Sequence, residues 1–132
     1  MAGEYRVDTL AVPETIGLLH ELLDRVRAEH PDVQSTDIML FETAVIEIAN
    51  NVVEHGRPPG ELSYSFTLDV EPDRLRGLLS EGGEALPELS FKMPGHLSEE
   101  GRGLALAKMA LDDLEYVRVD GRNEWRMTRV RR

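Results

Sequence analysis

The segment 62–70 alternates apolar and polar residues without interruption, and this pattern constrains the fold more than any other feature of the sequence. Strict alternation predicts a β-strand with one buried face and one polar face. Residues 71–73 form a short turn, and the pattern over 74–80 predicts a second strand directly after it. Because so short a connection joins antiparallel neighbours, we expect an antiparallel pair that buries one face.

Similar patterns predict the remaining elements. Helices are expected at 13–29, 35–56 and 102–112, and further strands at 4–10, 114–119 and 125–130. Ser35 or Thr36 is expected to cap the second helix, Gly56 to end it, and Asp120–Gly121 to form the turn of the last hairpin. Helices and antiparallel strands that do not alternate strictly predict an α+β fold. We expect one domain over residues 1–132, a two-layer sandwich in which helices cover one face of a mixed, mostly antiparallel sheet.

Charge and composition exclude several classes of function. The 132 residues include 25 acidic and 15 basic side chains, for a formal net charge of −10. A protein that binds the phosphate backbone of nucleic acid needs the opposite sign. The absence of cysteine removes disulfides and thiol-based metal sites and fits a reducing cytosol. No apolar run is long enough to span a membrane. We therefore expect a cytoplasmic domain that binds neither nucleic acid directly nor a membrane.

Three polar residues on the second expected helix form the first candidate site. Glu47, Asn51 and His55 are four residues apart, which aligns them along one side of the helix beside its apolar stripe. A carboxylate, an amide and an imidazole in such a row could act as a base, a metal ligand and a phosphate contact. The same spacing suits a solvated polar face, and an imidazolium is favourable at a helix C-terminus without any ligand. The adjacent Asn50 and Asn51 lower helix propensity, which favours the functional interpretation.

Two glycine-containing segments form the second candidate site. Gly101–Arg102–Gly103–Leu104 leads into the third expected helix, where free backbone N–H groups would attract an anion and Arg102 would add a charge-assisted contact. Gly82 and Gly83 could bring the backbone close to a flat ligand. A flexible helix entry and an ordinary loop are the alternative interpretations. Residues 81–103 lack periodicity, and a loop of this length is usually functional or disordered.

In this order, the segments resemble the ATP-binding fold shared by gyrase, Hsp90, histidine kinases and MutL. Residues 41–56 resemble the Asn box of that superfamily, in which Glu, Asn and His recur every four residues. Residues 99–130 resemble its second glycine box with the helix and hairpin that follow. Within the superfamily, the chain is most similar to the small anti-sigma-factor serine kinases of the RsbW and SpoIIAB type, over roughly residues 5–130.

The resemblance implies a role for each matching residue. Asn51 would bind the Mg²⁺ that bridges the phosphates of ATP, His55 would belong to the nucleotide-binding residues, and Glu47 would accept the proton of a substrate serine. The second glycine box, 101–104, would hold the phosphates through its two glycines, and residues 84–100 would form a mobile lid. Members of the family bind a sigma factor, phosphorylate a serine of a competing anti-anti-sigma protein, and typically act as homodimers.

The first glycine box, 79–83, departs from the family's Asp-x-Gly pattern, in which Asp accepts a hydrogen bond from the amino group of adenine. Alignment on Gly82 places Ser80 at the Asp position, and alignment on Gly83 places Glu81 there. Loss of one charge-assisted hydrogen bond costs about 1.5–3 kcal/mol. The alternative function is therefore a catalytically weak or inactive protein-binding regulator that keeps the fold.

Overall fold

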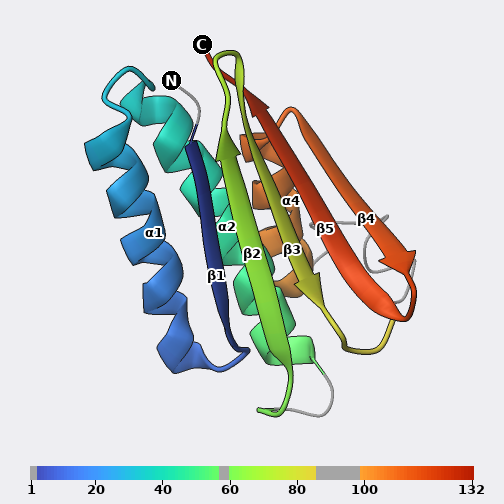
Figure 1. Cartoon of the computed structure of the whole chain (residues 1–132). Coiled ribbons are helices and arrows are strands. Elements are labelled where there is room, and N and C mark those ends of the chain that lie inside the picture. The colour runs from blue at the N-terminus through green and yellow to red at the C-terminus, as the bar shows by residue number, and fades with distance from the viewer. Residues whose placement is uncertain (1–2, 57–59, 86–98) are drawn as a thin grey trace.

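The structure is a computed structural model that describes residues 3–56, 60–85 and 99–132. Its elements are β1 (Gly3–Leu10), the 3-10 helix η1 (Pro13–Thr15), α1 (Ile16–Glu29), α2 (Ser35–His55), β2 (Ser63–Val70), β3 (Arg74–Glu81), α4 (Glu99–Ala110), β4 (Asp113–Val119) and β5 (Arg122–Val130). The five strands form one open sheet, and Figure 1 shows the helices behind it. No helix within the described ranges is long and apolar enough to cross a membrane.

The sheet has the order β1-β2-β3-β5-β4, and all four pairings between the described strands are antiparallel. The predicted α+β two-layer architecture is confirmed, with an antiparallel sheet in place of a mixed one. The last hairpin enters the sheet through its second strand, so that Arg74 pairs with Val130 at one end and Glu81 with Asn123 at the other. This register places the ends of β3 and β5 beside each other.

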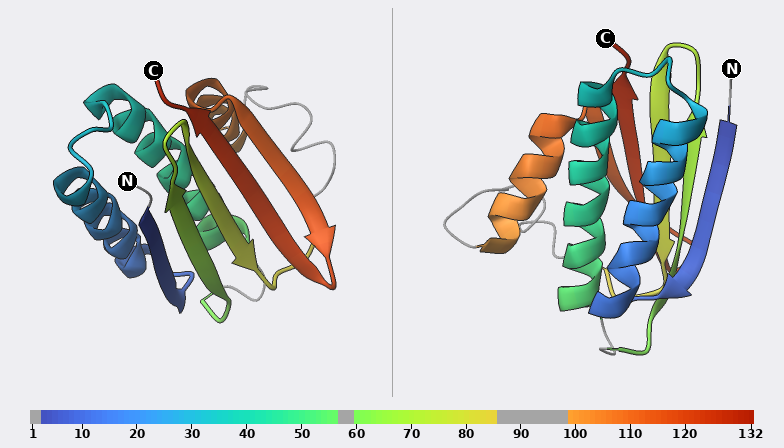
Figure 2. Two further views of the ribbon diagram at one scale, coloured as in Figure 1. Left: turned by 45° about the horizontal axis from the view of Figure 1, so that its top comes forward. Right: turned by 90° about the vertical axis from the view of Figure 1, so that its left-hand side faces the viewer.

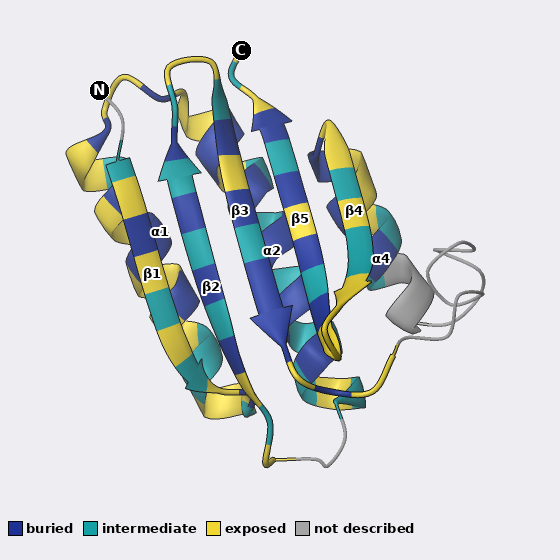
Figure 3. Cartoon of the chain, turned by 45° about the vertical axis from the view of Figure 1, so that its right-hand side comes forward, coloured by how far each residue is buried: buried dark blue, intermediate teal, exposed yellow. Residues whose placement is uncertain are grey.

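The helices form the second layer, in which α2 lies between α1 and α4 (Figure 2). Alternate residues of β2 and β5 are buried beneath this layer, as the banding in Figure 3 shows. Phe66, Leu68 and Leu79 from the sheet and Phe41 and Ile48 from α2 are completely buried. Burial of each such side chain stabilises the fold by about 1.5–3 kcal/mol. The period-2 and helical patterns in the sequence therefore identify the packed faces correctly.

Helix α1 begins at Ile16 rather than at residue 13, because residues 13–15 form the 3-10 helix η1. The cap of α2 and the start of α4 also differ from the expectation. Residue Gln34 occupies the N-cap of α2 and no side chain caps that helix, so the expected cap by Ser35 or Thr36 is wrong. Instead Asp37 in its first turn is buried and pairs with Arg129. Helix α4 begins at Glu99 rather than at residue 102. The last turn follows the prediction, with positive φ values of 50° at Asp120 and 77° at Gly121.

Candidate functional site

The polar row of α2, formed by Glu47, Asn51 and His55, meets α4 at Glu47. A Cβ atom added at Gly103 would lie 2.7 Å from Oε2 of Glu47. Any residue with a side chain at position 103 would therefore displace the carboxylate of Glu47 or the helix that carries Gly103. Packing of α4 against α2 brings together the two motifs that the sequence places more than fifty residues apart. The carboxylate of Glu47 accepts no hydrogen bond from the residues that the structure describes.

Asn51 and His55, one and two turns further along α2, lie beside the end of β3. They line a small pocket of about 30 Å³, roughly the space of one water molecule, together with residues of β3, β5 and the following loop. The other described residues of its lining are Val52, Gly56, Glu81, Gly83, Glu84, Asn123 and Trp125. The polar row of α2 therefore runs from the start of α4 to the first glycine box. Like Glu47, the side chain of Asn51 makes no hydrogen bond within the described part of the chain.

The structure distinguishes the two candidate residues of the first glycine box. Glu81 is only 5% exposed and lines the pocket beside Asn51. Its Oε1 accepts a 2.6 Å hydrogen bond from the backbone N–H of Gly83, and its Oε2 accepts a 2.9 Å bond from Asn123 Nδ2. Ser80 is one residue earlier in the same strand, so its side chain points to the opposite face of the sheet. There its Oγ accepts a 3.0 Å hydrogen bond from Nε of Arg122.

Asn123, which the sequence analysis did not single out, organises the base of this site. It is 2% exposed, and its amide nitrogen donates to Glu81 and to the carbonyl oxygen of Glu84 at 2.7 Å. Its Oδ1 accepts hydrogen bonds of 2.5 Å from the Tyr116 hydroxyl and 2.8 Å from Nη1 of Arg118. Asn123 lies on the inward face of β5 together with the apolar Trp125 and Met127. The strand expected from the sequence begins at residue 125, so Asn123 fell outside it.

The remaining predicted site residues contribute backbone or packing. Leu104 is 3% exposed and belongs to the core, so it offers a potential ligand only its backbone. Gly101 and Arg102 lie in the first turn of α4, where backbone N–H groups are free of helical hydrogen bonds. A Cβ at Gly82 would lie 3.3 Å from Nη1 of Arg122, outside the pocket. Most of the expected lid, 84–100, lies outside the described residues.

The donor set at the site suits Mg²⁺ that arrives with a phosphate ligand. Mg²⁺ takes oxygen ligands and is usually bound by one or two protein groups together with substrate phosphates and water. The Asn51 amide oxygen accepts no hydrogen bond from the described residues, and Gly103 adds no side chain to the start of α4, where the Glu47 carboxylate lies against it. Among the described residues, no group of three or more His, Asp or Glu side chains could hold a metal ion alone.

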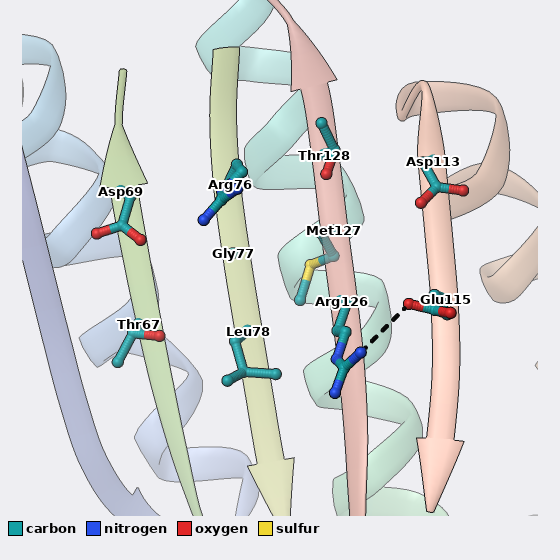
Figure 4. Close-up of a pocket in the computed structure, with 10 residues that line it drawn as sticks. All are labelled: Thr67, Asp69, Arg76, Gly77, Leu78, Asp113, Glu115, Arg126, Met127 and Thr128. Atoms are coloured by element: carbon teal, nitrogen blue, oxygen red, sulfur yellow. Dashed lines mark ion pairs between the residues drawn. The ribbon is translucent and has the colours of Figure 1, made fainter.

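A larger hollow of about 370 Å³ lies on the face of the sheet away from the helices (Figure 4). Its described lining consists of Thr67, Asp69, Arg76, Gly77, Leu78, Asp113, Glu115, Arg126, Met127 and Thr128. Charges of both signs meet there, with Arg126 Nη1 at 3.6 Å from Glu115 Oε1. None of the residues singled out from the sequence lines this hollow, so it is separate from the site on α2.

Comparison with known proteins identifies the fold. Residues 10–129 match the histidine kinase-like ATPase domain. The solved structure of the RsbU and RsbW domains of Rv1364c from Mycobacterium tuberculosis is similar, with a TM-score of 0.73 and 19% identity over 98% of this chain and 33% of that chain. The histidine kinase domain of a blue-light activated kinase from Erythrobacter litoralis has a TM-score of 0.58 and 14% identity, over 86% of this chain and 59% of that one.

The nucleotide-free catalytic domain of the histidine kinase ThkA is also similar, with a TM-score of 0.60 and 10% identity over 99% of this chain and 97% of that chain. At these identities the likeness concerns the fold alone. This chain spans about a third of the Mycobacterium tuberculosis chain. No curated protein matches the sequence.

Proposed function

Because this chain belongs to the histidine kinase-like ATPase domain family, whose fold implies ATP binding, we propose that it is an ATP-dependent protein-serine kinase and an anti-sigma factor. In this proposal it binds a sigma factor in the cytoplasm and phosphorylates a serine of the antagonist that competes for it. The observation that carries the proposal is the approach of Glu47 to Gly103, which joins a carboxylate without a hydrogen bond to the described residues to the helix start that would hold the phosphates.

Glu47 would act as the general base of the transfer. The substrate serine Oγ attacks the γ-phosphorus of ATP, its proton passes to the Glu47 carboxylate, and the bond to the β-phosphate oxygen breaks to leave ADP and phosphoserine. An uncommitted carboxylate is suited to this role because it must accept a proton at the moment of transfer. Phosphoryl transfer otherwise depends on positioning and charge neutralisation.

The other site residues would hold the nucleotide. Bound Mg²⁺ would supply charge neutralisation between the phosphates, with Asn51 as its protein ligand. The phosphates would bind at the start of α4, at Gly101, Arg102 and Gly103. Glu81, rather than Ser80, would accept the hydrogen bond of the adenine amino group, because only Glu81 shares a pocket with Asn51. We assign residues 84–100 to the lid on the resemblance alone.

Charge and the structural relatives support protein partners. A sigma factor presents basic surfaces to DNA, and a chain of net charge −10 suits such a partner electrostatically. The Mycobacterium tuberculosis structure contains an RsbU and an RsbW domain in one protein, which is consistent with a partner-switching role. We extend the proposal to a homodimer, the state typical of the kinases that the sequence resembles.

Thermal unfolding with and without Mg-ATP tests whether the site binds nucleotide. Ligand at about 100 times its dissociation constant should add near 2.7 kcal/mol to the free energy of unfolding. A second experiment captures binding partners from the native host, once in ATP and once in ADP, and identifies them by mass. They should include a sigma factor and a protein that gains one phosphoserine in ATP. In the thermal unfolding experiment, Mg²⁺ without nucleotide is the control. No stabilisation by Mg-ATP would exclude the kinase.

A binding regulator without transfer activity is the second candidate. It is favoured by the state of Glu81, whose two oxygens already accept hydrogen bonds from Gly83 and Asn123. A carboxylate held in this way contributes to the fold whether or not a base binds. Under this function the captured sigma factor would remain bound equally in ATP and ADP, and no captured protein would gain a phosphate.

A further inference from the structure

A buried guanidinium lies at the opposite end of the helix layer from the candidate site. Arg129 of β5 is 7% exposed and points inward between α2 and α4. Its Nε donates a 2.9 Å hydrogen bond to Oδ1 of Asp37, which is 1% exposed in the first turn of α2. Its Nη1 donates a second 2.9 Å bond to the carbonyl oxygen of Ala110, the last residue of α4.

One side chain therefore binds the ends of both helices that carry the site. Asp37 and Glu47 are ten residues apart on α2, which corresponds to about 15 Å along the axis, and Ala110 and Gly103 are seven residues apart, or about 10 Å. The two helices run antiparallel, so the Arg129 contacts and the Glu47–Gly103 contact lie at opposite ends of one helix pair. The rigid helices between them transmit any shift in register.

Helix α4 needs such a link because it lies at the edge of the helix layer (Figure 2). Within the described chain it packs against α2 on one side and has no helix on the other. The planar guanidinium donates in two directions at once, to an acidic side chain and to a carbonyl group, which a lysine ammonium does with less geometric definition. The backbone N–H of Arg132 also donates to Oδ2 of Asp37 at 2.9 Å, which fixes the carboxylate.

A buried ion pair of this kind is weak evidence for stability, since well-packed apolar residues often stabilise a protein as much or more. This pair instead fixes the positions of two helix ends, because Arg129 contacts Asp37 of α2 and Ala110 of α4. We propose that Arg129 is a positioning residue that sets the axial register of α4 against α2, and thereby the approach of Gly103 to Glu47. This inference rests on the proposed function for its catalytic consequence, although the register itself is a property of the fold.

The first arm of the test measures the register directly. The chain has no cysteine, so spin labels can be attached at Glu54→Cys and Met109→Cys, two exposed positions near opposite ends of the helix pair. Arg129 joins the end of α4 to Asp37. The helical rise of α2 from position 37 to position 54 therefore separates the labels by roughly 25 Å. The Asp37→Asn/Arg129→Met double variant leaves no buried unpaired charge, so it keeps the test independent of a folding defect.

We expect one narrow distance distribution in the parent chain and a distribution broadened or shifted by at least about 1.5 Å, one helical rise, in the double variant. Arg129→Lys should give an intermediate result. Arg27→Met is the matched control, because Arg27 joins α1 to α2 through Glu42 and does not contact α4. An unchanged distribution in the double variant would overturn the positioning role.

The second arm measures phosphoryl transfer per folded molecule. A misplacement of about 1 Å can lower a rate by about 100-fold, so we expect kcat to fall 10- to 100-fold in the double variant and to remain within about 2-fold in Arg27→Met. A purely structural role would lower the folded fraction and leave kcat of the folded molecules unchanged, which would also overturn the inference. Absence of transfer in the parent chain would refute the proposed function, and the distance measurement would still decide the register.

Discussion

The two ends of the candidate site use their polar groups in opposite ways. At the α4 end, the Glu47 carboxylate makes no hydrogen bond with the described residues and fits against α4 only because Gly103 has no side chain. The Asn51 amide, one turn further along α2, also makes no hydrogen bond with the described residues. At the β3 end, both oxygens of Glu81 accept hydrogen bonds, and Asn123 satisfies both its amide nitrogen and its oxygen. Partly buried polar groups without partners reduce stability, so their presence favours a ligand-binding role.

The resemblance drawn from the sequence differs in the same way, because the second glycine box follows the pattern of the family and the first glycine box departs from it. The extra methylene of Glu81, relative to the family's Asp, lets the carboxylate reach back to the N–H of Gly83. The first glycine box thus gains an internal hydrogen bond at the position where the family recognises adenine. Where the phosphates would bind, Glu47 makes no hydrogen bond with the described residues. Where the base would bind, both oxygens of Glu81 already accept hydrogen bonds from the protein. We call these the open end and the closed end of the site.

The largest expected effect is at the open end. Glu47→Gln keeps the shape of the side chain but removes its capacity to accept a proton, so phosphoryl transfer should fall about 100- to 10,000-fold. The dissociation constant of Mg-ATP should change little. Single-turnover kinetics and calorimetric titration measure the two quantities. The control is Glu21→Gln at an exposed position of α1, which should retain the parent rate.

Asn51→Ala should have the next largest effect, on binding. Loss of the amide oxygen removes a ligand of the nucleotide-bound metal ion, so the affinity for Mg-ATP should fall at least about 10- to 150-fold, corresponding to 1.5–3 kcal/mol. Calorimetric titration measures the change. Asn50→Ala, one residue earlier and outside the pocket lining, should bind Mg-ATP normally. Equal affinities in the two variants would contradict the assignment of Asn51.

The smallest effect is expected at the closed end. Glu81→Asp shortens the side chain and frees it from Gly83, so a carboxylate oxygen becomes available to the amino group of adenine. We expect affinity for ATP to rise about 3- to 10-fold, the effect of one hydrogen bond. Ser80→Asp, on the opposite face of the sheet, should leave affinity unchanged. If Ser80→Asp tightens binding instead, the base is recognised in the other register.

The sequence predicted those features that depend on local pattern. The alternating strands, the positive-φ turn at Asp120–Gly121 and the α+β class follow from periodicity and turn chemistry, and the structure confirms them. The row of Glu47, Asn51 and His55 lies on one helix as expected. The structure brings the second glycine box to this row, as the resemblance implies.

The features that the sequence did not predict depend on contacts between distant segments. Asn123 and Arg129 lie at inward strand positions, and their partners are 42 and 92 residues away. Local propensity likewise placed the start of α4 three residues late, because glycines were interpreted as a helix entry. The choice between Ser80 and Glu81 depended on which face of β3 meets α2, and Glu81 lies on that face.

If Glu47 and the start of α4 form one catalytic site, the variant Gly103→Ala should impair it. Its Cβ would meet only the flexible end of Glu47, while alanine favours a helix by about 0.5–1 kcal/mol, so stability should be unchanged or slightly higher. Gly17→Ala on α1 is the matched control, because nothing lies within 4 Å of its Cβ.

The measurement is kcat for phosphoryl transfer, compared with the free energy of unfolding, in Gly103→Ala and Gly17→Ala. The account predicts a loss of about 10- to 100-fold in kcat in Gly103→Ala alone, with neither variant less stable than the parent chain. Full activity in a folded Gly103→Ala protein would contradict the account, because the carboxylate would then be dispensable at the position where it meets α4.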